Sequence, residues 1–563
     1  MILERLRDLH ARVEHELPPA YHKKQRIQWI LALDEQGHFL NFERAETGKK
    51  TFVEMTTPYL KRTSGTRPLL LVDKPSYVLG LPDDDTEKAR AQAEERHAAF
   101  KALIEACALS VDDPTLAAFL HFLKDGVETA RGHPLTADMA AGDLIAPRVG
   151  EVYPTDLPQV RSYWQAREDD RAAENSAVTG TCMLCGETKP IVPMHPVDVR
   201  VGGDAAPLVS ANASAFESYG LNRSEIAPMC QRCARTYGEA LRFLLGSNRH
   251  KLYLGGLYWI FWTRKETPGF DIMAFLTTPE EEQVKKLLLS VQTGTTSAAL
   301  KANDFYALAV TSNKRMVVRS WLTMTVAQVQ ENLARYFKRQ RMLDYQGKSP
   351  PLKLLSLAGA TVRDLKDLSP QVVPLLLEHA LTRRPLPLSI LHRAVQRARA
   401  DRDHVMTRPR AVLIKMVLLS QPDLSEERMV HESLTPDHPS AAYQCGRLLA
   451  VLDSIQREAI DAKATLVDRF YGAASATPAS VFGVLLRKAQ THQGKLRKNK
   501  QKKWLHDYFE KQLGEIMSHL TGFPRTLTLE EQGLFAIGFY QQKYRPRKPS
   551  DSGESASSED LSE

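Results

Sequence analysis

The amino-acid sequence predicts an α+β N-terminal region, then a helical region, and finally a C-terminal four-helix bundle. In the first part of the chain, short apolar runs alternate with turn residues, which is typical of strands. From Val326 onward, apolar residues recur at helical spacing instead. Two C-x-x-C pairs within the first part add a third observation, because such pairs often hold a metal ion that fixes a small α+β segment.

The bulk properties fit a chain of several folded domains. Its 563 residues are enough for roughly two to four domains. The formal net charge of +8 is compatible with nucleic-acid binding but does not prove it. There is no signal-like N-terminus and no apolar run of membrane-spanning length, so we expect a cytoplasmic protein. The expected parts are an α+β domain at 1–325 with a zinc-binding insert at about 181–235, a helical connecting region at 326–436, a helical bundle at 437–545 and a disordered acidic tail at 546–563.

The N-terminal part begins with elements that the sequence defines in order. An amphipathic helix is predicted at 2–17, where two prolines end it. Alternating patterns at 27–34 and 38–43 flank a glycine-containing turn and predict a hairpin. The apolar run at 69–72 predicts a strand, and the charged stretch at 83–108 predicts a helix.

The cysteines form the most specific pattern in the chain. Two C-x-x-C pairs supply the four thiolates that tetrahedral Zn²⁺ needs, although their spacer is longer than in compact zinc ribbons. Four sulfur ligands leave no open position for water, so the zinc is expected to be structural rather than catalytic. A redox pair is the alternative, and His195 is expected to be an ordinary loop histidine. The expected metal ligands are Cys182, Cys185, Cys230 and Cys233. The lone thiols Cys107 and Cys445 are expected to be buried.

Cations gather in three stretches. In the first, a basic and hydroxyl-rich loop precedes the run at 69–72, and it is either a phosphate clamp or a solvated surface loop. Its candidate contacts are Lys61, Arg62, Thr63, Ser64 and Arg67. In the second, a hairpin predicted at 305–310 and 316–321 carries Arg315 and Arg319, which either face nucleic acid or are solvated.

The third stretch lies in the predicted bundle. There the sequence predicts helices at about 440–471, from 478, at 501–520 and at 529–543, the last opened by a capping box at Thr528 and Glu531. A loop between two of them is expected to bind the phosphates of a displaced DNA strand, with Trp504 stacking a base, unless it only solubilises the protein. Its cations are Arg487, Lys488, Lys495, Arg497, Lys498, Lys500, Lys502 and Lys503.

The order of several short motifs resembles a known family. An Arg-Thr-Ser-Gly segment at 62–65 leads to Tyr-Val-Leu-Gly at 77–80, and Ser-Tyr-Gly at 218–220 precedes the second cysteine pair. Glu-Gln-Gly at 531–533 and Gly-Phe-Tyr-Gln at 538–541 close the pattern. This order is similar to that of the Csd-type CRISPR-associated family, the large subunit of the type I-C CRISPR Cascade complex. The family's Ser-Phe-Asn motif reads Ser-Ala-Asn here, because Ala211 replaces the phenylalanine.

The resemblance implies a non-enzymatic subunit of an RNA-guided ribonucleoprotein in antiviral defence. Such a subunit recognises the protospacer-adjacent motif (PAM), helps to unwind target double-stranded DNA, stabilises the displaced non-target strand in the R-loop and recruits the helicase-nuclease. Its partners are the guide RNA and the backbone, guide-processing and small subunits of Cascade. The resemblance also implies that Asn212 lies near nucleic acid and that a small subunit starts internally at Met429, or otherwise at Met406.

Two other classes of function remain open from the residues alone. One is a stand-alone zinc-containing DNA-binding regulator, and the other is a metal-dependent nuclease that uses an acidic cluster. The sequence contains no P-loop, zincin or serine-hydrolase motif. Pairs such as Asp112-Asp113 are typical of solvated loops, so no nuclease centre is predicted.

Overall fold

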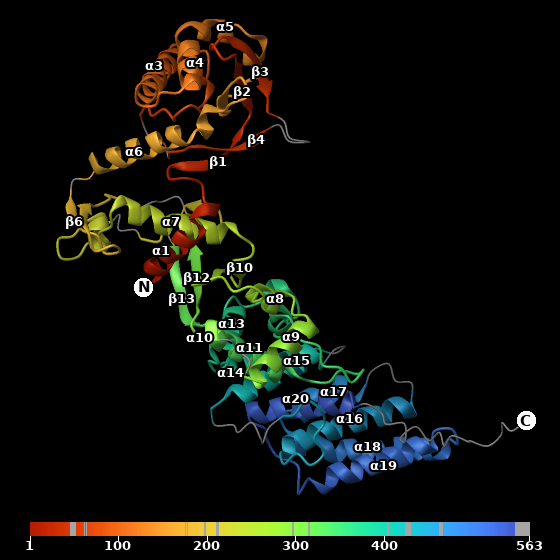
Figure 1. Ribbon diagram of the computed structural model, residues 1–563. Helices are drawn as coiled ribbons and strands as arrows, with labels where there is room; N and C mark the ends of the chain where they lie inside the picture. Colours follow the sequence, from red (N-terminus) through yellow and green to blue (C-terminus); the bar gives the residue numbers. More distant parts are fainter. Residues whose placement is uncertain are drawn as a thin grey trace, which may run out of the picture. The chain divides into compact units, whose positions relative to one another are not determined.

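The computed structural model divides into two compact units, which we describe separately (Figure 1). Unit 1 comprises Met1–Phe243 with Ser312–Met316, and unit 2 comprises Leu244–Thr311 with Val317–Glu563. The structure describes residues 1–545 apart from 46–51, 61, 63–64, 175, 177, 196–198, 206, 210–212, 295–297, 313–315, 402–404, 423–429 and 461–464. The predictions for Lys61, Thr63, Ser64, Asn212, Arg315, Met429 and the tail at 546–563 lie outside the described residues.

Unit 1 is a mixture of small sheets and helices. Strand β2 is the centre of a three-stranded sheet, antiparallel to β3 and parallel to β5. All five residues of β2 are buried, as expected for a strand covered on both faces. The strands are β1 (His22–Ile27), β2 (Trp29–Leu33), β3 (Phe39–Arg44), β4 (Val53–Pro58), β5 (Ile145–Val149), β6 (Thr179–Thr181), β7 (Thr188–Pro190), β8 (Arg200–Val201) and β9 (Asp204–Ala205).

The helices of unit 1 cover this sheet with apolar side chains. Phe100 and Ile104 from one helix and Phe119 from the next join the buried residues of β2 in one core cluster. Figure 1 shows these two helices, α3 and α4, together beside the sheet. The helices are α1 (Ile2–Val13), α2 (Pro75–Val78), α3 (Glu87–Ser110), α4 (Pro114–His121), α5 (Val127–Arg131), α6 (Pro158–Glu174) and α7 (Gln231–Gly246).

The first hairpin forms as predicted, but the strand expected at 69–72 does not. Strands β2 and β3 pair in antiparallel register around the turn that contains Gly37. The run at 69–72 is buried, yet Leu71 has a φ of 66° and the Val72 N–H donates to the Leu70 carbonyl at 2.8 Å. This three-residue turn has a positive central φ and is a strained form. The apolar character of the run therefore reflects burial in a turn rather than in a strand.

Unit 2 begins with a four-stranded sheet in the order β10-β11-β12-β13. Residues 305–310 of strand β12 are buried, and the predicted hairpin at 305–310 and 316–321 is formed by β12 and β13. A single apolar cluster runs from Trp259 on the sheet to Tyr540 on the last helix. The strands are β10 (Lys251–Leu254), β11 (Leu257–Thr263), β12 (Asp304–Ser312) and β13 (Met316–Thr325).

The rest of unit 2 is helical, as expected from the apolar spacing after Val326. Helix α11 begins there, with Thr325 as its cap and Gln328 completing a capping box. The helices are α8 (Ile272–Thr277), α9 (Glu281–Gln292), α10 (Ala298–Lys301), α11 (Val326–Gln340), α12 (Leu354–Gly359), α13 (Val372–Thr382), α14 (Leu388–Ala400), α15 (Arg408–Ser420), α16 (Ala441–Ala459), α17 (Leu466–Ala474), α18 (Pro478–Lys498), α19 (Lys503–Ser518) and α20 (Leu529–Lys543).

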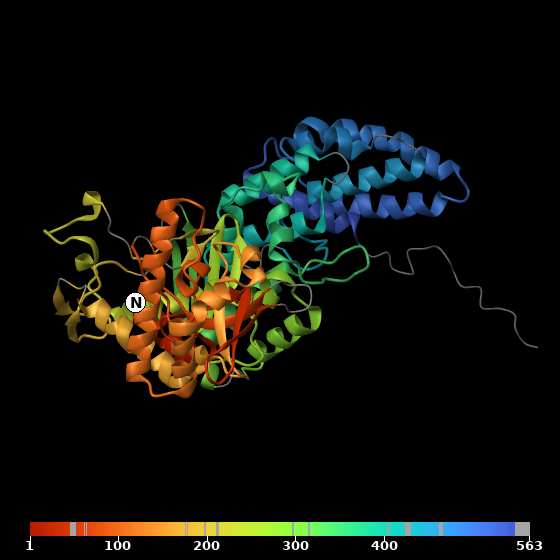
Figure 2. The ribbon, with the colours of Figure 1, turned by 90° about the horizontal axis from the view of Figure 1, so that it is seen from above.

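Helices α16, α18, α19 and α20 lie side by side in both views of the C-terminal region (Figures 1 and 2). Ser440 caps α16 as predicted, and Thr528 with Glu531 forms the predicted capping box of α20. The single helix expected at 440–471 is wrong, because it is divided into α16 and α17. Ile460 is extended, with φ −147° and ψ 146°, and a new capping box opens α17 at Thr465.

The domain boundaries predicted at 325 and 436 remain predictions. The compact units divide the chain between Phe243 and Leu244, because the sheet of β10–β13 shares its core with the helices that follow. Among the residues that the structure describes, no helix combines the length and apolar character that a membrane crossing requires.

Candidate metal centre and cationic surfaces

The first cysteine pair lies in the turn of a small hairpin. Strands β6 and β7 pair in antiparallel register, and Cys182 and Cys185 lie between them. The Cys182 N–H donates to the Glu187 carbonyl at 2.9 Å, and the Gly186 N–H donates to the Cys182 carbonyl at 2.8 Å. Gly186 has a φ of 76°, a conformation that glycine adopts without a steric penalty. The turn therefore presents both thiols on one side.

The second pair lies where a loop enters helix α7. Cys230 forms an isolated bridge with Ile191, which follows strand β7, and Cys233 lies in the first turn of the helix. Two backbone hydrogen bonds join the pairs, from Met183 N–H to the Pro228 carbonyl at 2.8 Å and from Val192 N–H to the Met229 carbonyl at 2.9 Å. The backbone thus brings together two pairs that are far apart in the sequence.

The four sulfur atoms fit a tetrahedral metal ion. Their Sγ atoms all lie within 4.8 Å of one another. Zn–S bonds of about 2.3 Å in a tetrahedron place sulfurs about 3.8 Å apart, which lies within this limit. Cys182, Cys230 and Cys233 are buried, while Cys185 is exposed. The cluster can therefore hold a metal ion near the surface of unit 1.

The thiols have unequal acidities before any metal is considered. Burial alone would raise the pKa of Cys182, but backbone N–H groups of Cys185, Cys230 and Leu184 stabilise its thiolate and lower the pKa to about 6. Burial raises the pKa of Cys230 and Cys233, and the neighbouring Cys182 adds to both increases. One thiolate is thus favoured by the fold, and a cation would favour the others.

His195 is buried and is not part of the four-cysteine cluster. Its Nδ1 lies 2.9 Å from the Tyr237 hydroxyl and its Nε2 lies 2.9 Å from the Ala227 carbonyl oxygen. Burial lowers its pKa, so the neutral ring is favoured. Both ring nitrogens are therefore used inside the protein, which leaves the four cysteines as the candidate metal ligands among the described residues.

Arg62 of the basic N-terminal loop is held inside unit 1. Its guanidinium forms an ion pair with the buried carboxylate of Asp73 and lies 4.4 Å from the centre of the Tyr77 ring. Asp73 also accepts from the N–H groups of Leu69 and Lys74, both at 2.8 Å. These contacts fix the strained turn at Leu71 from both ends. Arg62 thus has a structural partner, whether or not it also meets nucleic acid.

Of the other contacts predicted in the region 1–325, the two that the structure describes are open to solvent. Arg67 is exposed on the same loop as Arg62. Arg319 is exposed on β13, which is an edge strand of the sheet in unit 2. Both side chains are accessible to a nucleic acid, and their contact with it stays a prediction.

The C-terminal cations lie mainly on a helix, so the prediction of a loop is wrong. Helix α18 continues to Lys498, and α19 begins at Lys503, which leaves only a short connection. The exposed cations are Arg487, Lys488, Lys495, Arg497, Lys498, Lys500 and Lys503, and we call this set the α18–α19 cationic surface. A helix holds such cations in fixed register.

Two predicted members of that group have internal contacts. The Lys502 ammonium donates to the Glu458 carbonyl at 2.6 Å and lies 3.6 Å from the Glu458 carboxylate. Trp504 packs against the apolar core and contacts the Tyr508 ring at 6.5 Å between centroids. Trp504 is therefore partly committed to the core, which reduces the face it offers to a base.

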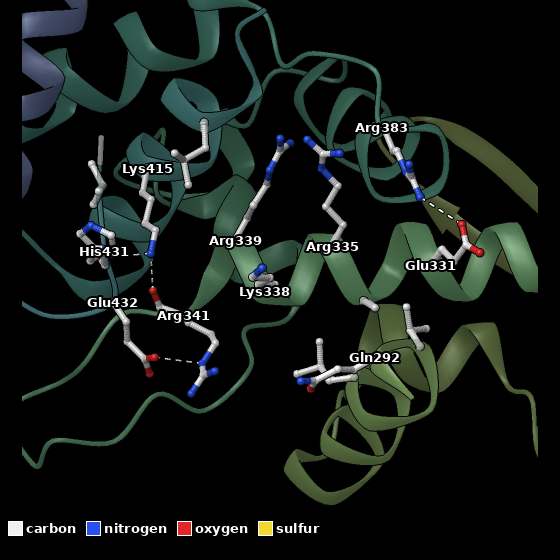
Figure 3. Close-up of a pocket in the computed structure, with 15 residues that line it drawn as sticks. Gln292, Glu331, Arg335, Lys338, Arg339, Arg341, Arg383, Lys415, His431 and Glu432 are labelled. Atoms are coloured by element: carbon white, nitrogen blue, oxygen red, sulfur yellow. Dashed lines mark hydrogen bonds and ion pairs between the residues drawn. The ribbon is translucent and has the colours of Figure 1, made fainter. Parts of the chain in front are cut away.

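Sequence reasoning missed a second group of cations in unit 2. They line a cavity of about 1080 Å³ and include Arg335, Lys338 and Arg339 of α11 (Figure 3). Their spacing on one helix was a usable signal, since residues three and four apart share a face. Arg383 and Lys415 join them from other helices, and no local pattern indicates that.

These features define a two-unit α+β protein with a four-cysteine cluster and a helical C-terminal region. Residues 3–545 match the family described as CRISPR-associated protein (Cas_Csd1). The chain therefore belongs to the Csd1 family of CRISPR-associated proteins and is a Cascade-type protein. Among curated proteins, none matches the sequence.

Proposed function

We propose that the protein is the non-catalytic large subunit of an RNA-guided surveillance complex in the bacterial or archaeal cytoplasm. The observation that carries the proposal is the family match, which spans nearly the whole chain. In this role the subunit recognises the PAM beside the target, helps to open the duplex, stabilises the displaced strand and recruits the helicase-nuclease. Base pairing with the guide RNA selects the sequence, and the protein reads only the adjacent motif.

The metal in the cysteine cluster is proposed to be a structural Zn²⁺. Four thiolates from two C-x-x-C pairs are the donor set that structural zinc sites use. When bound, the ion would supply charge balance and a cross-link between the β6–β7 hairpin and the start of α7. The chain's own residues orient the sulfurs through the backbone hydrogen bonds at Cys182 and Gly186.

The exposed cations are proposed to contact phosphates. The α18–α19 cationic surface offers seven exposed cations without an acidic residue between Arg487 and Lys503 in the sequence. Such a surface gains free energy from a polyanion through counterion release. Arg67 and Arg319 are exposed in the region 1–325, to which the proposal assigns the duplex and its PAM.

Co-purification tests the proposed assembly. The full-length protein is expressed with its neighbouring genes and a guide RNA locus, and the purified material is analysed for RNA and protein. We expect a guide RNA and backbone subunits to co-purify, and the complex to bind target DNA only when the guide matches. Sequence-specific binding without a guide would favour the regulator, and DNA cleavage by the isolated protein with Mg²⁺ would favour the nuclease.

The salt dependence of DNA binding tests the α18–α19 cationic surface. A variant with glutamine at Lys495, Arg497, Lys498 and Lys500 is compared with the wild-type complex. Each lost phosphate contact on a single strand flattens the slope of log affinity against log salt by about 0.7. The matched control removes four exposed cations elsewhere in unit 2, namely Lys348, Lys353, Arg363 and Lys366. Equal slopes for the two variants would contradict the assignment.

A further inference from the structure

The turn at residues 218–221 in unit 1 presents an exposed aromatic ring. The Leu221 N–H donates to the Ser218 carbonyl at 2.9 Å, and these two residues form an isolated bridge. The central residues, Tyr219 and Gly220, both have a positive φ, at 53° and 73°. Two positive values in a two-residue turn are typical of type I′, which favours asparagine followed by glycine. Tyrosine therefore occupies a backbone position for which its side chain is poorly suited.

Packing within the chain does not compensate for the strained conformation of Tyr219. A bulky residue is an outlier in the left-handed region, because its Cβ atom crowds the backbone. The side chain is 99% exposed, so it buries almost no apolar area on folding. Arg223, four residues further on, also has a left-handed φ, at 47°. Strained residues are concentrated at functional sites, and an exposed ring at the tip of a tight turn suits a binding site.

Further apolar side chains are exposed on the backbone segments beside this turn. The turn leads into the short 3-10 helix η6 (Arg223–Ile226). The Ser224 hydroxyl of this helix donates to the Val192 carbonyl. The Met183 N–H donates to the Pro228 carbonyl at 2.8 Å, so three segments of the chain lie side by side. The exposed apolar side chains on these segments include Met183, Met194, Leu221 and Ile226.

The composition of this surface favours a protein partner over a nucleic acid. Residues 213–229 contain two carboxylates, Glu217 and Glu225, and one cation, Arg223. A phosphate backbone requires an excess of cations, which the α18–α19 cationic surface has and this segment lacks. Tyrosine and methionine are enriched where proteins meet, and exposed apolar area is typical of such interfaces. The exposed Glu217 adds a preference for a cation at the rim of the partner's surface.

We propose that the turn at 218–221 is a docking element for a neighbouring protein subunit. The Tyr219 ring enters an apolar pocket of that subunit, which carries a cation at its rim, and the side chains of Met183 and Met194 lie against the surface around the pocket. Tyrosine is a frequent centre of binding energy in protein interfaces, because its ring buries a large area at a low cost in conformational entropy. The inference rests on the proposed function, since it takes the neighbour from the proposed surveillance complex.

The variant Tyr219→Asn separates docking from folding. Asparagine adopts the left-handed backbone readily, so this variant is expected to fold at least as well as the wild type, which thermal melting measures. The control is Tyr345→Asn, which removes a tyrosine that is 71% exposed in a turn of unit 2. A third variant, Tyr219→Phe, keeps the aromatic ring at the tip of the turn. A role of Tyr219 in the turn alone would leave all three variants equal in binding.

Binding is measured with the full-length protein. Each labelled variant is titrated with the purified complex of guide RNA and the other subunits, prepared without this chain. We expect Tyr219→Asn to bind at least about tenfold more weakly than the wild type and Tyr345→Asn, and Tyr219→Phe to retain the wild-type affinity. Equal affinities of Tyr219→Asn and Tyr345→Asn would overturn the inference and leave the proposed function intact. If the wild type did not bind this complex, the proposed function and the inference would both fail.

The class of partner is checked with a photoreactive benzophenone amino acid in place of Tyr219. Irradiation of the assembled complex is expected to join this position to a peptide of another subunit, which mass spectrometry identifies. A cross-link to nucleic acid, to a second copy of this chain or to no molecule at all would overturn the assignment to a neighbouring subunit.

Discussion

The segment around the cysteine cluster and the helix pair α16–α20 are held together by different means. Among the described residues, the two large apolar clusters include none from 179–245, so the buried side chains of the cysteine segment lie outside both clusters. Helices α16 and α20 instead contribute Tyr443, Leu448, Phe535 and Phe539 to the largest cluster. The proposed metal would cross-link the first region, which also buries Tyr237, Leu241 and Leu244, whereas the second depends on the close approach of two backbones.

Loss of a metal ligand is expected to have the largest effect. In Cys182→Ser, the cluster keeps three thiols, and the β6–β7 hairpin loses its cross-link to α7. Structural zinc sites contribute roughly 10 kcal/mol of binding free energy to folding, so losing a ligand should unfold the segment locally. Elemental analysis is expected to show less zinc, and limited proteolysis is expected to cleave within 179–235.

A cysteine outside the cluster provides the control. Cys107 is buried in the core of α3, and Cys107→Ala removes a thiol without touching the cluster. This variant should keep its zinc and resist proteolysis between β6 and α7. If the wild-type protein contained no metal, or if both variants lost metal equally, the contrast between the two regions would no longer rest on zinc.

The second prediction concerns the ion pair that fixes the strained turn in unit 1. Arg62→Gln leaves the buried Asp73 carboxylate without its cation, and breaking a buried pair typically costs roughly 3–5 kcal/mol. Arg67→Gln changes an exposed side chain and should leave stability within about 0.5 kcal/mol. Chemical denaturation measures both. If Arg62→Gln were as stable as Arg67→Gln, Arg62 would have no structural role and would remain a candidate for nucleic-acid contact alone.

The third prediction tests the close helix crossing in unit 2. A Cβ atom at Gly446 of α16 would lie 2.0 Å from the Phe535 carbonyl oxygen of α20, and one at Gly538 would lie 2.2 Å from the Tyr443 carbonyl oxygen. Because these are backbone atoms, the helices must separate, and Gly446→Ala should destabilise the protein by at least about 1–3 kcal/mol. Gly483→Ala on exposed α18, where no atom lies within 4 Å, should stabilise it by about 0.5–1 kcal/mol. If Gly446→Ala and Gly483→Ala changed the free energy of unfolding in the same direction, this packing would be contradicted.

Local patterns predicted the cysteine pairs and several helices of the C-terminal region, and distant contacts decided what they missed. The capping box at Thr528 and Glu531 and the cysteine pairs were visible because each depends on a few neighbouring residues. The run at 69–72 misled because burial in a strained turn and burial in a strand require the same apolar residues. The break between α16 and α17 involves Gln456, which accepts from the Leu466 N–H at 2.6 Å.

The cavity lined by cations in unit 2 was harder to predict, because its lining comes from residues that are distant in the sequence. Arg335 and Arg339 share a face of α11, which the spacing reveals, but Arg383 and Lys415 reach the cavity only through the packing of α13 and α15. The helical position of the cations at 487–498 was missed for another reason. The run of cations hides the sparse apolar positions, and buried Leu496 and Phe482 keep α18 against the core.

The last and smallest expected effect concerns the buried ammonium of unit 2. Burial lowers the pKa of Lys415 from 10.5 to about 8, since desolvation disfavours its charged form. At pH values below the folded-state pKa, Lys415 is protonated in both the folded and the unfolded protein. The folded protein then carries the full free-energy cost of burying the charged ammonium. As the pH rises, the folded state releases its proton first, so the cost falls and disappears above 10.5. The free energy of unfolding of the wild type, relative to Lys415→Met, should therefore rise by about 1 kcal/mol between pH 7 and pH 9. Denaturant titrations of both proteins at several pH values measure this difference. Subtracting one free energy of unfolding from the other cancels the contributions of the other titrating groups. A difference that stays constant with pH would mean that the ammonium is solvated, and it would remove the contrast with the paired Asp73 carboxylate of unit 1.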